Sequence, residues 1–300
     1  MNFQDQIEIL KKQLNAKILA HNYIDLEVQQ YADMIGDSLF LSRQAAKAEN
    51  PVLVFCGVKF MAETAAVLAA DKTVLIPEKT AYCTMAQMVG VDEVKTLKNK
   101  YPQAAVVCYV NSSLEVKAVS DVVCTSANAV EIVSKLEQHQ IIFVPDQNLG
   151  AYVQYKLPQK EIILPSGFCY VHHEISDEDL IRLKEKYPEA EIIAHPECPL
   201  DTLKIADKVG STSQMAKFVE QSDRSQFIIC TEQGMLNKMS VDFPRKSIIV
   251  PLVPRYCYGM KKITVESLYN SLNLLRYKVD VDPELAGRAR KAINRMLELS

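Results

Sequence analysis

Three cysteines recur at a nearly fixed interval in this 300-residue chain and could together hold one metal centre. Cys83, Cys169 and Cys257 are 86 and 88 residues apart, and each follows an apolar run that ends in proline. Three thiolates leave one position of a tetrahedral site open. With zinc, water would complete a catalytic-type site; with a [4Fe–4S] cluster, one open iron could act as a Lewis acid. The alternative is that all three are core cysteines inherited from a repeat.

The other five cysteines are predicted to be structural. Cys56, Cys108, Cys124 and Cys230 lie in or beside apolar strand-like runs, where cysteine behaves as a small buried hydrophobe. We also interpret Cys198 as structural. Because no Cys-x-x-Cys pair occurs, zinc-finger and ferredoxin spacings are excluded.

Two histidines and a tyrosine stand at matching places in the same repeat. His21, Tyr109 and His195 each end a predicted apolar strand, and they are 88 and 86 residues apart. Each histidine has an ionisable partner two residues later, Tyr23 or Glu197. Such pairs are suited to proton transfer, so these four residues are the catalytic candidates. The alternative is that the histidines are simply hydrogen-bonded at strand ends.

Further polar residues are predicted to bind a ligand. Tyr109 and Asn111 carry no charge at neutral pH and are interpreted as binding residues. His172 is three residues after Cys169, so one helical turn would place it over the same centre. Its alternative is a position at a helix edge.

Hydroxyl residues recur where helices are expected to begin. Ser38, Ser126 and Thr212 are again 88 and 86 residues apart. Free N–H groups at helix N-termini attract carboxylate or phosphate, so three such ends would suit a small polyanionic substrate. Alternatively, the hydroxyls are ordinary caps, and Ser38 is a plausible N-cap. A further set on this spacing is interpreted mainly as structural: Val58, Asp146 and Glu232.

These intervals predict one α/β unit used three times, an internal triplication. Short apolar strands alternate with helices, which predicts three similar three-layer α/β/α domains with short parallel sheets around a pseudo-threefold axis. Three strands are expected per unit, at 18–20, 52–55 and 73–76 in the first, where 26–34 and 38–48 are expected to be helical. The expected boundaries are 1–83, 84–169 and 170–262, and helices in 263–300 should pack back on the first repeat. Ligands should bind where the strands end.

Composition excludes several functional classes. Hydrophobic residues make up 48% and charged residues 24%, and the net charge is −3. Basic residues are dispersed, so nucleic acid is not an expected partner. No apolar run reaches the length of a membrane span, and the first ten residues do not have the pattern of a signal peptide. We therefore expect a cytoplasmic protein.

The motifs resemble those of the quinolinate synthase family, the A protein of bacterial NAD biosynthesis. The resemblance covers nearly the whole chain and is specific because many motifs occur together. They include Ala20-His21-Asn22-Tyr23, Gly36-Asp37-Ser38-Leu39, the 56–65 segment beginning Cys56-Gly57, Tyr109-Val-Asn-Ser-Ser113, Cys169-Tyr-Val-His172, His195-Pro-Glu-Cys198, Gly210-Ser-Thr-Ser213, Thr231-Glu232 and Met260-Lys261-Lys262-Ile263-Thr264.

That resemblance implies an enzyme with a [4Fe–4S] cluster on Cys83, Cys169 and Cys257 and one open iron. It implies condensation of iminoaspartate with dihydroxyacetone phosphate to quinolinate, with release of phosphate and two waters. L-aspartate oxidase or aspartate dehydrogenase, which make iminoaspartate, are the implied protein partners. By matching position, the substrate-lining residues would be His21, Ser38, Tyr109, Val110, Asn111, Ser126, His172, His195, Pro196, Glu197, Ser211 and Thr212.

The sequence departs from the family pattern at three places. Tyr258-Gly259-Met260 follows Cys257 where Cys-Pro-x-Met is usual, Tyr82 precedes Cys83 where glycine is usual, and Ile24 replaces a common polar residue. None of these changes removes a cysteine ligand. Two other functions stay open from the residues: a different hydratase-type lyase using the same open iron, and a non-catalytic iron–sulfur sensor.

Overall fold

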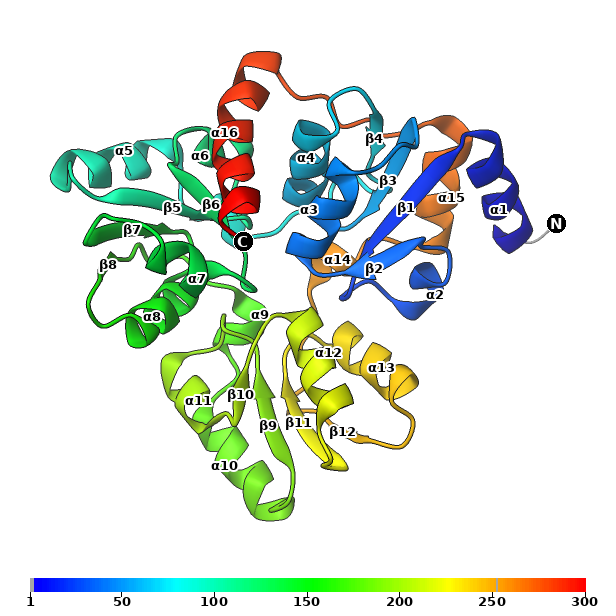
Figure 1. The fold of residues 1–300 in the computed structure, drawn as a ribbon. Helices are drawn as coiled ribbons and strands as arrows, with labels where there is room; N and C mark the ends of the chain where they lie inside the picture. Colours follow the sequence, from blue (N-terminus) through cyan, green and yellow to red (C-terminus); the bar gives the residue numbers. More distant parts are fainter. Residues whose placement is uncertain (1–2, 252) are drawn as a thin grey trace.

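Three α/β units surround a common centre in the computed structural model, which describes residues 3–251 and 253–300 (Figure 1). Each unit contains a four-stranded sheet in which neighbouring strands run parallel. Helices flank the sheets, as burial of both faces of a parallel sheet requires. The predicted α/β fold class with short parallel sheets is confirmed.

The first unit has the strand order β2-β1-β3-β4. Its central strands, β1 (Ala16–His21) and β3 (Val52–Cys56), are almost wholly buried, as the apolar runs predict. The remaining elements are α1 (Phe3–Gln13), α2 (Leu26–Gln29), β2 (Met34–Gly36), α3 (Ser38–Ala46), α4 (Lys59–Leu68) and β4 (Thr73–Leu75).

The second unit repeats this order as β6-β5-β7-β8, and the third as β10-β9-β11-β12. The second comprises η1 (Met85–Gln87), α5 (Val91–Lys100), β5 (Ala105–Tyr109), α6 (Leu114–Ala118), β6 (Val122–Cys124), α7 (Ala129–Ser134), β7 (Gln140–Val144), α8 (Gln147–Lys156) and β8 (Glu161–Ile163). The third comprises α9 (Tyr170–His173), α10 (Asp177–Lys186), β9 (Glu191–Ala194), α11 (Leu200–Ile205), β10 (Lys208–Val209), α12 (Thr212–Gln221), β11 (Gln226–Cys230), α13 (Gln233–Asp242) and β12 (Ser247–Ile249).

Each sheet has one more strand than the three that we predicted. In the first unit this is β2 (Met34–Gly36), which lies inside and just after the segment expected to be helical. It pairs with Leu19, Ala20 and His21 of β1. The expectation was wrong because a two- or three-residue edge strand is too short to show alternation, and its pairing is decided by tertiary contact.

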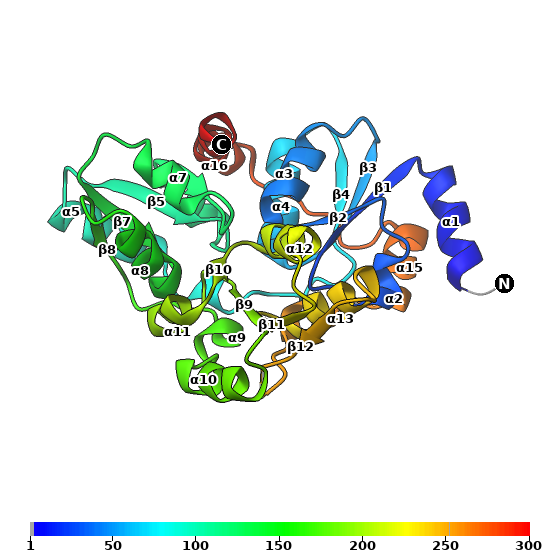
Figure 2. The same ribbon diagram turned by 60° about the horizontal axis from the view of Figure 1, so that its bottom comes forward.

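The C-terminal helices pack in two places. α14 (Tyr258–Lys261) follows Cys257, and α15 (Val265–Leu274) packs against α1. α16 (Pro283–Leu299) packs mainly against α6 and β6 and also against α4, so it lies between the first and second units (Figures 1 and 2). The expected packing of the tail on the first repeat therefore describes α15, whereas α16 packs on both the first and the second units.

None of the helices in the described ranges combines the length and the apolar character that crossing a bilayer requires.

Candidate active site

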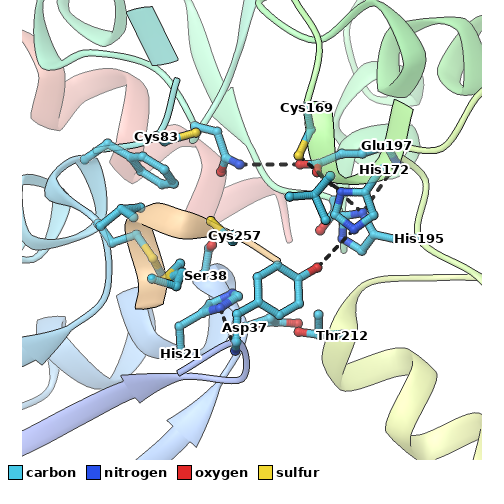
Figure 3. Close-up of a pocket in the computed structure, with 18 of the residues that line it drawn as sticks. His21, Asp37, Ser38, Cys83, Cys169, His172, His195, Glu197, Thr212 and Cys257 are labelled. Carbon is cyan, nitrogen blue, oxygen red and sulfur yellow. Dashed lines mark hydrogen bonds and ion pairs between the residues drawn. The ribbon is translucent and has the colours of Figure 1, made fainter. Parts of the chain in front are cut away.

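One cavity lies where the carboxyl ends of the three sheets meet, and it has about 570 Å³ of space not filled by atoms. Every unit contributes to its wall, because His21 ends β1, Tyr109 ends β5 and His195 follows β9. The chemically capable lining residues are His21, Tyr23, Asp37, Ser38, Cys83, Tyr109, Asn111, Ser126, Cys169, His172, His195, Glu197, Thr212 and Cys257. Figure 3 shows Cys83 and Cys169 at one end of the pocket and His21 and Thr212 at the other.

The three cysteine loops are attached to the sheets in the same way. The first residue of a helix donates its backbone N–H to a carbonyl two residues before each cysteine. The three bonds are Lys59 N to Ala81 O at 2.8 Å, Gln147 N to Gly167 O at 2.7 Å, and Gln233 N to Arg255 O at 2.7 Å. Because α4, α8 and α13 follow the second central strand of each sheet, these bonds fix Cys83, Cys169 and Cys257 relative to the strand ends.

All three thiols face an environment that disfavours the thiolate. Burial raises the pKa of Cys83 to about 12 and the pKa of Cys257 to about 11. Burial also raises the pKa of Cys169, and the charges of Glu197, Cys83 and Cys257 add to the effect. The thiols thus stay protonated at neutral pH unless a cationic centre compensates for their charge.

Glu197 is the most densely contacted acid of the cavity. It is 3% exposed and receives hydrogen bonds from the Tyr109 hydroxyl and, at 3.4 Å, from Asn111 Nδ2. Its Oε2 lies 2.7 Å from His172 Nδ1 and 3.8 Å from His195 Nδ1. Burial alone would raise its pKa, but the adjacent His172 and the hydrogen bond from the Tyr109 hydroxyl hold the pKa below its usual value. Glu197 is therefore an ionised carboxylate at neutral pH.

His21 and His195 are neutral at physiological pH. Burial lowers the pKa of His21 to about 4 and the pKa of His195 to about 3, and at His195 the neighbouring His172 lowers it further. Burial, together with the negative charge of Glu197, raises the pKa of Tyr23 and of Tyr109 well above 10. Both tyrosines thus keep their protons at neutral pH.

His172 connects a cysteine to the polar side of the cavity. Its Nδ1 lies 3.3 Å from Cys169 Sγ, which is the proximity that the three-residue spacing predicts. Its Nε2 lies 2.9 Å from Thr231 Oγ1 and 3.3 Å from the Tyr23 hydroxyl. Tyr23 and Thr231 share a further hydrogen bond of 2.7 Å. Tyr23, Thr231, His172 and Glu197 therefore form one continuous network.

Two helix N-termini point their first residues into the cavity. Ser38 and Thr212 are the first residues of α3 and α12, and both line the wall. The caps are their predecessors: Asp37 accepts from Phe40 N, and Ser211 accepts from Gln214 N. The expected N-cap role of Ser38 was therefore wrong by one residue. Ser126 also lines the wall but lies in the turn before α7, whose cap position is Asn128.

Three of the residues proposed to line the substrate lie outside the cavity wall as the structure describes it: Val110, Pro196 and Ser211. Ser211 donates instead to Asp37 Oδ2 at 2.8 Å and so joins the first and third units. The residues interpreted as structural include two carboxylate caps, Asp146 of α8 and Glu232 of α13.

Sequence reasoning missed two polar members of the site and its apolar part. Asp37 lines the cavity, and its place before Ser38 in Gly36-Asp37-Ser38 was a usable signal. Thr231 contacts Tyr23 and His172 but resembles any threonine after a strand. The apolar lining was not predicted either and comprises Val58, Phe60, Met61, Val171 and Met260.

Comparisons with known proteins agree with the motifs. The family described as "Quinolinate synthetase A protein" matches residues 5–298. A quinolinate synthase of Alkaliphilus metalliredigens is 45% identical over 298 residues, covering 99% of this chain and 98% of the relative. Quinolinate synthases of Caldicellulosiruptor saccharolyticus (46%) and Clostridium kluyveri (47%) each cover 98% of this chain and 97% of their own length. The chain therefore belongs to the quinolinate synthetase A protein family, whose members are enzymes named for quinolinate synthesis in NAD biosynthesis.

Proposed function

We propose that the chain condenses iminoaspartate with dihydroxyacetone phosphate to form quinolinate, with loss of phosphate and two waters. The observation that supports this best is the composition of the cavity between the three units. Three cysteines, an ionised carboxylate, two neutral histidines and two protonated tyrosines from all three units line one space. A condensation with two dehydrations needs several proton transfers in one place, and these groups could supply them.

The cysteines fit the iron–sulfur cluster that the family resemblance implies. A single zinc ion with bonds of about 2.3 Å would bring its thiolates to about 4 Å from one another. Among residues 3–251 and 253–300, the three sulfurs do not form a group of ligand atoms within 4.8 Å. They line one cavity without meeting that spacing, so they suit a larger cationic centre. Cys83, Cys169 and Cys257 would hold the cluster, which would supply a Lewis-acidic iron with an open coordination position.

The opposite end of the cavity suits the anionic parts of the substrates. The free N–H groups and helix dipoles of α3 and α12 favour carboxylate or phosphate beside Ser38 and Thr212. The neutral state of His21 and His195 lets these side chains hydrogen-bond to substrate without adding positive charge. Asn111 would orient a substrate polar group beside Glu197.

Proton transfer is assigned to the network of Tyr23, His172 and Glu197. In the tautomer with the proton on Nδ1, His172 donates to Glu197 Oε2, and its Nε2 accepts from Tyr23 or Thr231. The Tyr23 hydroxyl can then donate its proton to substrate. When a proton leaves the substrate instead, the Tyr23 hydroxyl can pass a proton to His172 Nε2, and Glu197 stabilises the resulting positive charge. His21 packs edge-on against the Tyr23 ring, with centroids 4.6 Å apart, and so fixes its orientation.

We place this reaction in the cytoplasm. All eight cysteines are free, as expected in a reducing compartment. An enzyme that produces iminoaspartate, such as L-aspartate oxidase or aspartate dehydrogenase, would supply the first substrate.

The test is quinolinate formation by anaerobically purified protein supplied with dihydroxyacetone phosphate and freshly generated iminoaspartate. We expect product from the parent and none from Cys169→Ala. Protein shown to contain about four irons and four sulfides per chain that makes no quinolinate would contradict the assignment. In that case the same preparation should be tested for hydratase-type lyase activity on hydroxy acids and for a redox response without turnover.

A further inference from the structure

Cys169, His172 and Glu197 present three different ligand atoms to one point of the cavity. Their thiol sulfur, imidazole nitrogen and carboxylate oxygen all lie within 4.8 Å of one another, and no other trio of cysteine, histidine, aspartate or glutamate in the described ranges does so. His172 and Glu197 are 1% and 3% exposed. Sulfur, imidazole nitrogen and carboxylate oxygen are the ligands that zinc uses in proteins.

The groups behind these ligands are arranged as they are in metal sites. A metal-binding histidine usually donates its second ring N–H to a nearby oxygen, which fixes the ring. His172 directs Nδ1 at Cys169 and Glu197, and its Nε2 lies 2.9 Å from Thr231 Oγ1. The other carboxylate oxygen of Glu197 is held by the Tyr109 hydroxyl. The His172 ring and the Glu197 carboxylate are thus each oriented by a hydrogen bond to an atom other than the one that would bind the metal.

The charges also balance for a divalent ion. A thiolate, a neutral imidazole and a carboxylate carry two negative charges, which one divalent cation neutralises inside a buried site. Binding would release the thiol proton to solvent. Three protein ligands would leave a fourth coordination position for water.

We propose that the chain without its cluster binds one zinc-like divalent ion at Cys169, His172 and Glu197, and that this ion excludes the cluster. Cys169 cannot serve both centres, so occupation of one prevents the other. Zinc would therefore act as an inhibitor of maturation rather than as a cofactor. The binding claim stands on these contacts alone, whereas the exclusion claim rests on the proposed cluster function.

Cobalt(II) titration of the full-length chain, stripped of iron under anaerobic conditions, tests the binding claim. We expect one Co²⁺ per chain with a thiolate-to-cobalt charge-transfer band and the intense visible bands of four-coordinate cobalt. Cys169→Ala should abolish the charge-transfer band. Cys83→Ala and Cys257→Ala make the same chemical change at the other two loops and should keep it.

A smaller change tests the geometry around the histidine. Thr231→Val preserves the shape of the side chain but removes the oxygen beside His172 Nε2. We expect it to weaken Co²⁺ and Zn²⁺ binding by about 10- to 100-fold. Loss of the band in Cys83→Ala or Cys257→Ala would show a three-thiolate site and overturn the proposal. Unchanged binding in Cys169→Ala or in His172→Gln would overturn it as well.

Reconstitution tests the exclusion claim independently of turnover. One equivalent of Zn²⁺ added before iron and sulfide should prevent the brown cluster absorbance, and a chelator should restore it. In His172→Gln the cysteines remain, so the cluster should form despite Zn²⁺. Full cluster assembly in zinc-loaded parent protein would refute the exclusion claim while leaving the binding result intact.

Discussion

Replacing Tyr23 by phenylalanine should separate chemistry from stability in this site. The Tyr23 hydroxyl contacts Thr231 Oγ1 at 2.7 Å and His172 Nε2 at 3.3 Å. These two partners are themselves 2.9 Å apart. When the hydroxyl is removed, they still satisfy each other, so no buried polar group loses its last partner.

The two effects should therefore differ in size. Loss of one such hydrogen bond should lower the free energy of unfolding by about 0.5–1.5 kcal/mol. Loss of a general acid should lower kcat by about 10²- to 10⁴-fold, which corresponds to about 3–5 kcal/mol in the activation barrier. The ring of phenylalanine keeps the edge-on contact with His21, so substrate binding should change little.

The assay measures kcat and KM for quinolinate formation in parent and Tyr23→Phe proteins with equal iron and sulfide contents. Urea denaturation gives the change in stability. Thr231→Val is the control, because it removes a hydroxyl from the same network but leaves the phenol in place, and it should reduce kcat less. A variant with a raised KM and a kcat within about threefold of the parent would show that Tyr23 only binds substrate.

Lys117 is fully buried, and burial lowers its pKa from 10.5 to about 8. The folded state binds fewer protons than the unfolded chain between these pH values, so the contribution of Lys117 to stability rises with pH across this window. At pH 7 the Lys117→Met variant should therefore be more stable than the parent by up to about 3 kcal/mol. A stability difference between the two proteins that stays constant up to pH 10.5 in urea denaturation would argue against this. Asp37→Ala removes the cap of α3 and the acceptor of Ser211 and should cost about 1–2 kcal/mol, whereas Asp37→Asn should cost less; equal costs would exclude the capping explanation. A methyl group on Gly234 would lie 2.6 Å from Tyr23 O. The Gly234→Ala substitution should therefore lower the free energy of unfolding by about 1–3 kcal/mol and reduce kcat. An unchanged melting temperature would show that the backbone shifts to accommodate the methyl group without loss of stability.

The sequence predicted the site best where residues repeat at a fixed interval. The spacing of Cys83, Cys169 and Cys257 identified three loops that reach one cavity. It could do so because parallel strands place their carboxyl ends at one edge of a sheet, and equal spacing selects equivalent ends. Asp282-Pro283 is also a recognisable signal for the start of α16, since aspartate caps helices and proline suits the first helical turn.

Prediction was poorest where a tertiary contact decides the structure. The edge strands β2, β6 and β10 are two or three residues long and are defined only by the neighbours with which they pair. The place of α16 between α6 and α4 depends on surfaces far apart in the sequence. The hydrogen bond between Thr231 and Tyr23 likewise joins residues that are 208 positions apart in the sequence, so no local pattern predicts it.

Glu197 shows why the chemistry must lie between units rather than within one. An ionised carboxylate that is 3% exposed would be costly to bury in a single small sheet. Here Tyr109 and Asn111 of the second unit donate to one of its oxygens, and His172 lies 2.7 Å from the other. Because the carboxylate depends on donors from a separate sheet, loosening the contact between units would remove two of its hydrogen bonds and weaken the proposed proton transfer. The three sheets therefore form one site, although each has its own strands and helices.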